Sequence, residues 1–460
     1  MSEISFVDTT LRDGHQSLWA EGMTTGMMLP IAERMDQAGF EAMELISGSH
    51  LKKCVRELKE DPWERVRLVA KRITKTPLRV IAGRVNTFGF NPLSMYRVFL
   101  ERMAANGIRQ ARISEEWNDF SGWQRKVQTA REVGLEPIVN LIFSISPKHS
   151  DEYYARKTRE AASLGVPRLC TGLGPLCCLE AIKLGIKSIN TAIPPLANSA
   201  SNPSVFNIAR NARALGYTPA IDEAVVKPVV EHFTFIAKRE GFPTGMPVEY
   251  DYSQYLHQVP GGMISNLGHQ LRRVGLQDRL EEALKEAVRV RADFGYPSMV
   301  TPLSQYVGSQ AAINVIVGER YKEVTDQVIK YALGQCGEEG SSSMDPDVKD
   351  RILDRPRAKE LARWEPYEPS VEDLRSKLGG PGVSDEELLL RWLLTKDEIE
   401  AMRAAGAPKE YLSGTQPVVA LIEELAKRSN CSQIRIQRPD LSLILEKRPD
   451  TSKGPSTIDR

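Results

Sequence analysis

The first half of the chain alternates short apolar stretches with longer amphipathic ones at a nearly regular spacing. Seven stretches are typical of strands, at residues 4–8, 41–46, 78–82, 109–113, 136–142, 167–170 and 187–191. Amphipathic stretches that we predict to be helices lie between them, for example at residues 25–38, 94–105, 120–133 and 151–164. Such alternation predicts βαβ units and a parallel sheet. Most strand starts lie about thirty residues apart, which is the length of one βα unit.

A closed barrel accounts for this pattern better than an open doubly wound sheet does. The first strand is not followed by the glycine-rich turn of a dinucleotide-binding fold. Polar clusters follow several of the predicted strands, at residues 12–13, 84–86, 115–116 and 198–202. In a (β/α)₈ barrel the carboxyl ends of the strands form the active face. We therefore predict an α/β fold built on a TIM-type barrel, with the candidate site at that face.

The number of predicted strands is one short of a complete barrel. The last two predicted strands start at residues 167 and 187, which leaves only 20 residues for that unit. Either the chain lacks one βα unit, or one strand was not recognised in the sequence. Because closure depends jointly on strand number, tilt and shear, a barrel without one unit must reclose with seven strands or open along a seam. We expect residues 165–190 to be irregular or poorly packed.

The second half of the chain is predominantly helical in pattern. Helices are predicted at residues 222–240, 264–292 with a break near Gly275, 303–316, 319–334, 386–406 and 417–428. Residues 336–348 are predicted to be a loop and residues 365–385 a linker, and two short strands follow at 433–437 and 441–446. The predicted domains are a barrel (1–240), a helical domain (241–395) and a helix-hairpin tail (396–460) whose end, 447–460, is disordered.

Composition and charge bear on the partners of the protein and on the compartment in which it works. The formal net charge is +1, so no global field attracts nucleic acid or an acidic membrane. No apolar run reaches the length of a membrane span, and the N-terminus lacks the pattern of a signal peptide. None of the six cysteines forms a CxxC pair. These features predict a cytoplasmic protein in a reducing compartment.

The polar cluster after the first strand contains three candidate site residues. Asp13 could bind a divalent cation through oxygen, or it could pair with an arginine or cap the next helix. Arg12 could hold an anion or stabilise an enolate oxygen, or it could form a structural ion pair. Gln16 could donate to a substrate carbonyl, or it could be an ordinary surface residue. The residue types alone leave these alternatives open.

Other catalytic chemistries have less support in the sequence. No HxH, HxxxH or HExxH motif occurs, which weighs against a zinc hydrolase. GxSxG and a P-loop are absent as well. Of Glu115 and Glu116, one could face the mouth of the barrel. Lys148, in the loop after the fifth strand, is the candidate that an aldolase forming a Schiff base would need.

Several long blocks together resemble the biotin-dependent carboxyltransferase family. They are DTTLRDGHQSLWA (8–20), EDPWERVRLV (60–69), TAIPPLANSASNPS (191–204), VPGGMISNL (259–267) and GYPSMVTPLSQYVGSQAAINVIVGERY (295–321). The family includes the carboxyltransferase part of pyruvate carboxylase, the oxaloacetate decarboxylase α subunit and the pyruvate-side subunit of transcarboxylase. The resemblance runs from about residue 6 to about residue 395.

The resemblance implies a (β/α)₈ barrel, a helical funnel domain, a homodimer and partner subunits that carry and carboxylate biotin. It implies CO₂ transfer between carboxybiotin and pyruvate, oxaloacetate or a similar 2-oxo acid, with the enolate stabilised by a divalent metal (Zn, Mn, Mg or Co). Asp13 takes the position of a metal ligand, and Arg12 and Gln16 take the electrostatic and substrate-binding positions. No Met-Lys-Met biotinylation motif occurs, so biotin would arrive on another chain.

One departure from the family pattern concerns both the metal and the barrel. The family continues its sixth strand with a Lys-Asp pair, a helix and a seventh strand that ends in His-x-His. The lysine and both histidines are metal ligands there. Here RLC (168–170) joins directly to TGLG (171–174), so one βα unit is absent and Asp13 is the only ligand left in its family position.

Three further departures concern the substrate. The family threonine that shuttles a proton corresponds to Ala200, which has no exchangeable proton, and the neighbouring glutamine corresponds to Asn202. Gly83 holds the position of the arginine that grips the substrate carboxylate. Arg84 follows it and is the candidate substrate-binding residue.

These departures leave three interpretations open. The chain could be an active carboxyltransferase or oxaloacetate decarboxylase subunit. It could instead be a catalytically impaired scaffold that binds a biotin carrier or a sister subunit. The direct join at element boundaries also fits a segment that is missing through a deletion in the gene or a gap in the sequence.

Overall fold

A computed structural model describes most of the chain. The described residues are 2–87, 89, 91–165, 169–170, 174–248, 256–260, 264, 267–268, 271–272, 275–363, 368–409, 411, 433–438 and 441–446. The predicted helix at 417–428 and the predicted disordered end at 447–460 lie outside these residues.

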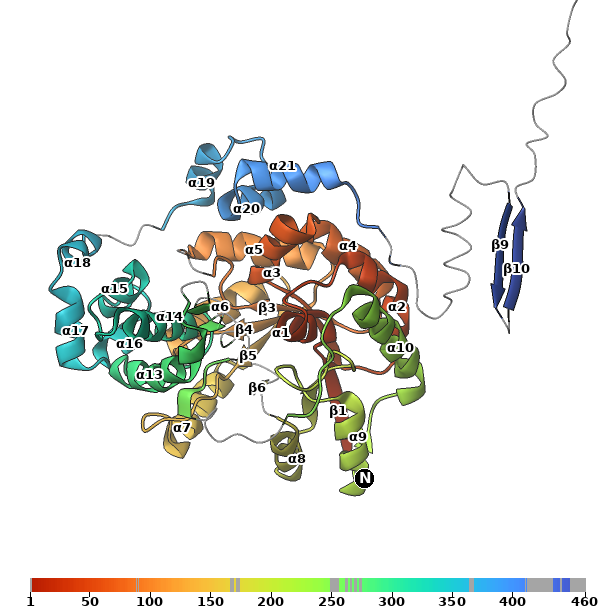
Figure 1. Ribbon diagram of the computed structural model, residues 1–460, viewed down its shortest axis with the longest axis horizontal. Helices are drawn as coiled ribbons and strands as arrows, with labels where there is room; N and C mark the ends of the chain where they lie inside the picture. The colour runs from red at the N-terminus through yellow and green to blue at the C-terminus, as the bar shows by residue number, and fades with distance from the viewer. Residues whose placement is uncertain are drawn as a thin grey trace, which may run out of the picture.

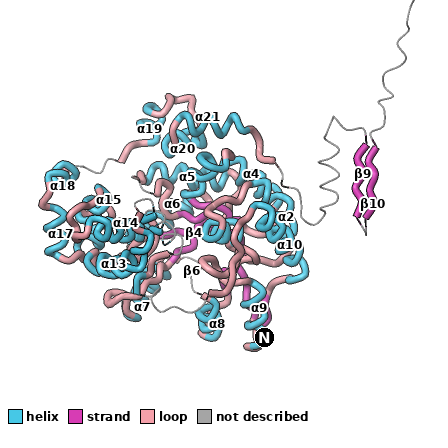
Figure 2. Tube along the Cα trace, in the orientation of Figure 1, coloured by secondary structure: helices cyan, strands magenta, loops and turns pink. Residues whose placement is uncertain are grey.

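A curled parallel sheet forms the centre of the molecule, and helices surround it (Figures 1 and 2). All seven predicted strands are present. They are β1 (Glu3–Asp8), β2 (Ala42–Ser47), β3 (Leu78–Ala82), β4 (Gln110–Ser114), β5 (Glu136–Asn140), β6 (Leu169–Cys170) and β7 (Ser188–Thr191). The prediction of a TIM-type α/β fold is confirmed. The count of seven was wrong by one, because a two-residue strand, β8 (Thr218–Pro219), also pairs with β1.

The hydrogen-bonded order of the strands is β6-β5-β4-β3-β2-β1-β7. Strand β7 pairs in parallel with β1, from Ser5 with Ser188 to Asp8 with Thr191. Strand β6 pairs with β5 through its two residues. Within the described part of the chain no pairing joins β6 to β7. The two ends of the hydrogen-bonded strand order, β6 and β7, therefore flank the place where the sequence lacks one βα unit.

Helices alternate with the strands along the chain. They are α1 (His15–Leu18), α2 (Thr25–Gln37), α3 (Gly48–Lys53), α4 (Pro62–Arg72), α5 (Leu93–Ala105), α6 (Phe120–Glu132), α7 (Asp151–Ser163), α8 (Pro175–Lys183), α9 (Val205–Ala214) and α10 (Glu223–Glu240). Side chains cap several of them at the predicted starts: Asp119 accepts from the Gly122 amide, and Ser150 from the Tyr153 amide. Capping by short polar residues explains why the sequence located these starts to within one residue.

The segment around α8 is poorly packed, as expected for residues 165–190. Leu176 is 71% exposed, and Leu184, just after the helix, is 86% exposed. Only one face of α8 is covered, since Cys178 and Ile182 are buried. Both leucines lie in the segment between β6 and β7, where the sequence lacks one βα unit.

A second apolar core lies among the helices that follow the barrel. These are α13 (Leu280–Asp293), α14 (Leu303–Val317), α15 (Asp326–Ala332), α16 (Glu338–Ser342), α17 (Pro346–Leu353) and α18 (Pro356–Leu361), with a short turn η3 (Gln277–Arg279) before them. Their core includes Phe294, Val307 and Tyr331. The helix predicted from residue 319 starts only at Asp326, because Gly318 ends α14 in a left-handed conformation and Thr325 caps α15.

Three other predicted segments differ from the structure for a similar reason. The predicted loop at 336–348 contains α16, and the predicted linker at 365–385 contains α19 (Val371–Lys377), which begins with a capping box of Ser370 and Asp373. The single helix predicted at 386–406 is divided into α20 (Asp385–Leu393) and α21 (Lys396–Ala405). Thr395 caps α21 and forms a capping box with Glu398.

Helices α20 and α21 pack on the barrel and not on the second core. Leu389, Leu393 and Met402 belong to the same buried cluster as Trp63 of α4 and Phe99 of α5. Helix α20 contacts α5, and α21 contacts the π-helical turn η2 (Cys54–Leu58). The domain boundaries at residues 240 and 395 stay a prediction.

A separate two-stranded antiparallel sheet, β9 (Gln433–Arg438) and β10 (Leu441–Glu446), lies where the two short strands of the tail were predicted. None of the helices that the structure describes is long and apolar enough to cross a membrane.

Candidate active site

The turn after β1 brings the first candidate residues to the carboxyl end of the sheet. Residues Thr10–Gly14 form a π-helical turn, η1. Asp8 stabilises its start, because its carboxylate accepts from the Thr10 hydroxyl at 2.5 Å and from the Thr10 amide at 3.2 Å. Glycine suits position 14, since a Cβ there would make a tight contact of 3.0 Å with the Leu196 carbonyl oxygen. The turn thus places Arg12 and Asp13 over the end of the sheet.

Arg12 is held by contacts on both sides of its guanidinium. Its Nε and Nη2 donate to Glu44 Oε2 at 3.0 and 2.6 Å. Its Nη1 donates to Asp13 Oδ1 at 3.0 Å and to Gln16 Oε1 at 3.4 Å. Gln16 therefore lies beside Arg12 and contacts it through its oxygen. The catalytic roles of Arg12 and Gln16 stay predictions.

Glu44 is the buried centre of a larger ion-pair network. This carboxylate, on β2, is completely inaccessible to solvent. Arg112 Nη1, from β4, lies 2.9 Å from Glu44 Oε1, and Arg79 Nη1, from β3, lies 4.0 Å from the same oxygen. Burial alone would raise the pKa of Glu44, but the guanidiniums of Arg112, Arg12 and Arg79 lower it below its ordinary value. Glu44 is therefore ionised at neutral pH.

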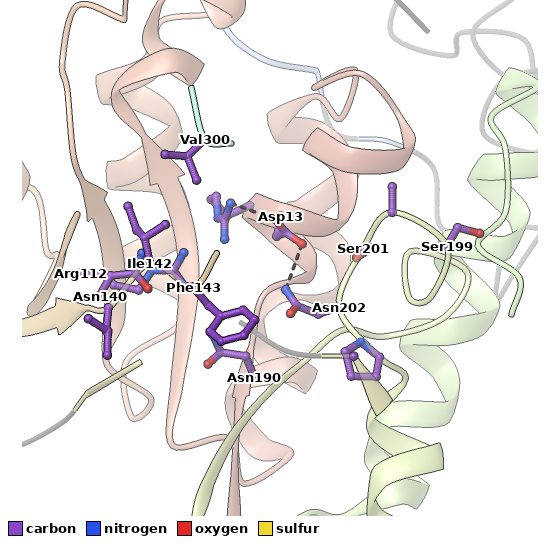
Figure 3. Close-up of a pocket in the computed structure, with 15 residues that line it drawn as sticks. Asp13, Arg112, Asn140, Ile142, Phe143, Asn190, Ser199, Ser201, Asn202 and Val300 are labelled. Carbon is purple, nitrogen blue, oxygen red and sulfur yellow. Dashed lines mark hydrogen bonds and ion pairs between the residues drawn. The ribbon is translucent and has the colours of Figure 1, made fainter. Parts of the chain in front are cut away.

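A cavity of about 470 Å³ opens beside this network at the carboxyl ends of the strands (Figure 3). The cavity is lined by residues of the turn after β1, of β4, and of the end of β5 with the loop after it. Residues of β7, of the loop after β7 and of the helical region also line it. The lining residues are Arg12, Asp13, Arg112, Asn140, Leu141, Ile142, Phe143, Gly174, Asn190, Ser199, Ala200, Ser201, Asn202, Pro203 and Val300. The size and the few convergent polar groups are typical of a small-molecule site.

The loop after β7 forms the wall opposite β4. Asn202 Nδ2 donates to Asp13 Oδ2 at 2.9 Å and to Thr9 Oγ1 at 3.0 Å (Figure 3). Ala200 lines the cavity at the position where the family resemblance expects a threonine. No exchangeable proton is thus supplied by this side chain. Asn202 has taken a structural role that ties the loop to the turn after β1.

Arg84 lies in a different cavity from Arg12 and Asp13. It lines a smaller hollow near Tyr96 and Glu116. Its Nη2 donates to the Gly89 carbonyl oxygen at 2.9 Å, and its Nη1 lies 3.8 Å from Glu116 Oε1. The substrate-binding role of Arg84 stays a prediction.

The remaining polar candidates of the sequence also lie away from the cavity lining. Lys148 Nζ contacts Ser343 Oγ at 3.1 Å and Glu339 at 3.0 Å, which ties the loop after β5 to the helical region. Glu115 pairs with Lys126 at 2.8 Å, and burial raises the pKa of Glu115 above its ordinary value. Both groups have structural partners.

The residues around Asp13 do not fit the divalent metal that the resemblance implies. Both Asp13 oxygens already accept hydrogen bonds, Oδ1 from Arg12 and Oδ2 from Asn202. Arg12 and Arg112 line the same cavity and would repel a cation. Mg²⁺ or Mn²⁺ wants several oxygen or nitrogen ligands, and among the described residues no three His, Cys, Asp or Glu side chains gather to hold one.

The sequence did not point to Arg112, which lines the cavity, or to Glu44 and Arg79, which belong to the buried ion-pair network beside it. The signal was present, because each is a charged residue inside a strand of a parallel sheet, where both faces are normally apolar. A charge in such a strand is stable only with a buried partner.

Comparison with known proteins finds similarity to carboxylase subunits and domains. A family model described as a conserved carboxylase domain matches residues 255–427. The B subunit of pyruvate carboxylase from Methanocaldococcus jannaschii is 34% identical over 391 residues, which cover 76% of this chain and 68% of that protein. The protein of the same name from Methanothermobacter thermautotrophicus is 31% identical, with 93% of this chain and 81% of that protein covered.

One more relative and one solved structure are also similar to this chain. The 2-oxoglutarate carboxylase large subunit of Hydrogenobacter thermophilus is 30% identical over 84% of this chain and 66% of that protein. The carboxyl transferase domain of Rhizobium etli pyruvate carboxylase superimposes with a TM-score of 0.79 at 19% identity, covering 98% of this chain and 84% of that domain. This structural similarity bears on the fold alone.

Proposed function

Because the chain belongs to the biotin-dependent carboxyltransferase family that includes these pyruvate carboxylase subunits, we propose that it is a carboxyltransferase subunit. It moves CO₂ between carboxybiotin and a 2-oxo acid such as pyruvate or oxaloacetate. One observation carries the proposal: Arg12, Asp13 and the loop after β7 meet in one cavity at the carboxyl ends of the barrel strands. That is the face where barrel enzymes carry out their chemistry.

The residues of the chain supply charge and position for this reaction. When a carboxyl group joins the methyl carbon of pyruvate, a proton leaves that carbon and negative charge develops on the 2-oxo oxygen. Arg12 is fixed by Glu44, Asp13 and Gln16, so its guanidinium needs no reorganisation as this charge forms. Carboxylated biotin, presented by a separate carrier, supplies the CO₂.

The expected partners follow from the same assignment. We propose a biotin carrier protein and a biotin carboxylase subunit as partners, and a homodimer as the working unit. Among the described residues, Cys54, Cys177 and Cys336 carry free thiols. Free thiols support work in a reducing cytoplasm.

A second candidate function is a scaffold that binds the biotin carrier without turnover. Ala200 favours it, because this side chain cannot carry the proton that must move between the 2-oxo acid and biotin. The exposed Leu176 and Leu184 beside the missing βα unit favour it as well.

Oxaloacetate decarboxylation by the purified chain, with a biotinylated carrier present, separates the two candidates. The natural chain is compared with a variant in which the missing βα unit is inserted between residues 170 and 171. The proposal expects measurable turnover by the natural chain and faster turnover by the restored one. Carrier binding without turnover by the natural chain supports the scaffold, and equal activity of both would overturn our account of the missing unit.

A further inference from the structure

Two guanidiniums on the cavity wall are anchored to one buried carboxylate. Arg12 contacts Glu44 Oε2 at 2.6 Å, and Arg112 lies 2.9 Å from Glu44 Oε1. The two arginines therefore flank a single side chain and are close neighbours, and both line the cavity. They come from separate elements, the turn after β1 and strand β4. Such a pair presents two positive charges to one small volume.

The anchoring holds both arginines in place before any ligand binds. The Arg12 side chain is 10% exposed and that of Arg112 is 13% exposed, while Glu44 is 0% exposed. Arginine normally loses much side-chain freedom when it binds an anion. Here folding has already fixed both side chains, so binding an anion costs less conformational entropy.

The charges on the cavity wall favour an anion over a cation. Asp13 is the only carboxylate among the described residues that line the cavity, and Arg12 and Asn202 occupy its two oxygens. Apart from the two arginines, the other polar side chains that the structure describes on the wall are uncharged amides and hydroxyls, which include Asn140 and Ser201. The cavity wall thus carries two guanidiniums and one carboxylate whose oxygens are already hydrogen-bonded. Exclusion of water from the cavity strengthens each electrostatic interaction.

From this arrangement we propose that the cavity binds a 2-oxo acid directly through Arg12 and Arg112, with no divalent metal between the protein and the substrate. The planar guanidinium fork matches a carboxylate, and a second guanidinium beside it can contact the 2-oxo oxygen. The two arginines do the electrostatic work that a metal ion would otherwise do. This inference rests on the proposed function for the substrate class, but it adds how the substrate is held.

The test measures binding of pyruvate and 2-oxoglutarate by isothermal titration calorimetry. The full chain is stripped of metal and kept in EDTA, and the titration is repeated with added Mn²⁺ in place of EDTA. Acetate, which lacks the 2-oxo group, is the competitor control. We expect a 2-oxo acid to bind in EDTA with an affinity that Mn²⁺ leaves within about twofold, a change below about 0.5 kcal/mol.

Three variants make the test specific. Arg112→Gln should weaken binding by about tenfold or more, as the loss of one charge-assisted hydrogen bond predicts. Arg112→Lys keeps the charge without the fork, so it should bind with intermediate affinity and serves if the Gln variant does not fold. The matched control is Arg97→Gln on α5, whose side chain is 46% exposed and which should bind like the natural chain.

Asp13→Asn distinguishes an arginine site from a metal site. Removing the only carboxylate among the described residues of the cavity wall should leave anion binding unchanged or tighter, whereas a metal site would lose its one family ligand. Binding that requires Mn²⁺ and disappears in Asp13→Asn would overturn the inference but leave the proposed function intact. No binding of either 2-oxo acid in any condition would overturn both. Competition by acetate as strong as that by pyruvate would overturn the assignment to 2-oxo acids.

Discussion

Replacing Glu44 by glutamine tests whether the buried ion-pair network holds the barrel together. Glu44 is inaccessible to solvent and lies within 2.9 Å of two guanidiniums. Glutamine keeps the shape but removes the charge, so Arg12 and Arg112 lose their shared buried counter-ion. Removing one partner of a buried ion pair typically costs about 3–5 kcal/mol, because the remaining charge is desolvated without compensation.

Urea unfolding followed by tryptophan fluorescence measures this cost. Trp63 and Trp123, which are 1% and 0% exposed, report on the barrel core. With a slope of about 3 kcal/mol per molar, the expected loss lowers the urea midpoint by about 1 M or more. The matched control is Glu101→Gln, which removes an exposed partner of Arg97 and should change stability by less than about 0.5 kcal/mol. A Glu44→Gln midpoint within about 0.3 M of the natural chain would refute the reasoning.

The same variant should alter the dependence of stability on pH. The pKa of Glu44 is held below its ordinary value of 4.5 in the folded chain. Its carboxylate therefore contributes stability that is fully present above pH 4.5 and is lost as the pH falls through the lower, folded pKa. The natural chain should lose more stability than Glu44→Gln does when the pH is lowered through this range.

Five other substitutions probe four separate features of the structure. Burial raises the pKa of Asp8 from 3.8 to about 7, so this group lowers stability as the pH rises between these values, and Asp8→Asn should flatten the urea midpoint against pH there. Burial holds the pKa of His15 well below 6.5, so the fold loses stability as the pH falls below 6.5, and His15→Gln should reduce this loss in acid-unfolding curves. Ala200→Thr should raise oxaloacetate decarboxylation several-fold or more by restoring a hydroxyl to the cavity wall, and an unchanged rate would show that no proton carrier is missing there. Ile182→Ala in α8, at a buried position, should cost about 2–5 kcal/mol, whereas Leu184→Lys, at an 86% exposed position, should cost less than about 0.5 kcal/mol in the same urea assay.

The sequence predicted the regular parts of the fold because their causes are local. Alternation of strand and helix patterns located the first seven strands, and short polar residues such as Asp119 and Ser150 marked helix starts. Strand β8 escaped prediction because two residues, one of them Pro219, carry no periodicity. The packing of α20 and α21 on the barrel also escaped it, because an apolar helix face does not reveal which core it will join.

The sequence predicted only the part of the candidate site that lies in the turn after β1. Arg12 and Asp13 are neighbours in sequence, and both line the cavity. Their partners Glu44 and Arg112 are far away along the chain, and the strands bring them together through registry across the sheet. Arg84 was placed with them by sequence analogy, but the structure puts it in another cavity. Contacts between strands depend on register and closure, which no local pattern encodes.

Transfer of a labelled carboxyl group from oxaloacetate to a biotinylated carrier is the direct test of the proposed carboxyltransferase activity. The full chain is incubated with a biotinylated carrier protein and with oxaloacetate labelled in the carboxyl group that is transferred. The account predicts label on the carrier with the natural chain, and a loss of about tenfold or more in Arg12→Gln, which removes a charge-assisted contact from the cavity. Absence of label with a natural chain that still binds both the carrier and a 2-oxo acid would contradict it.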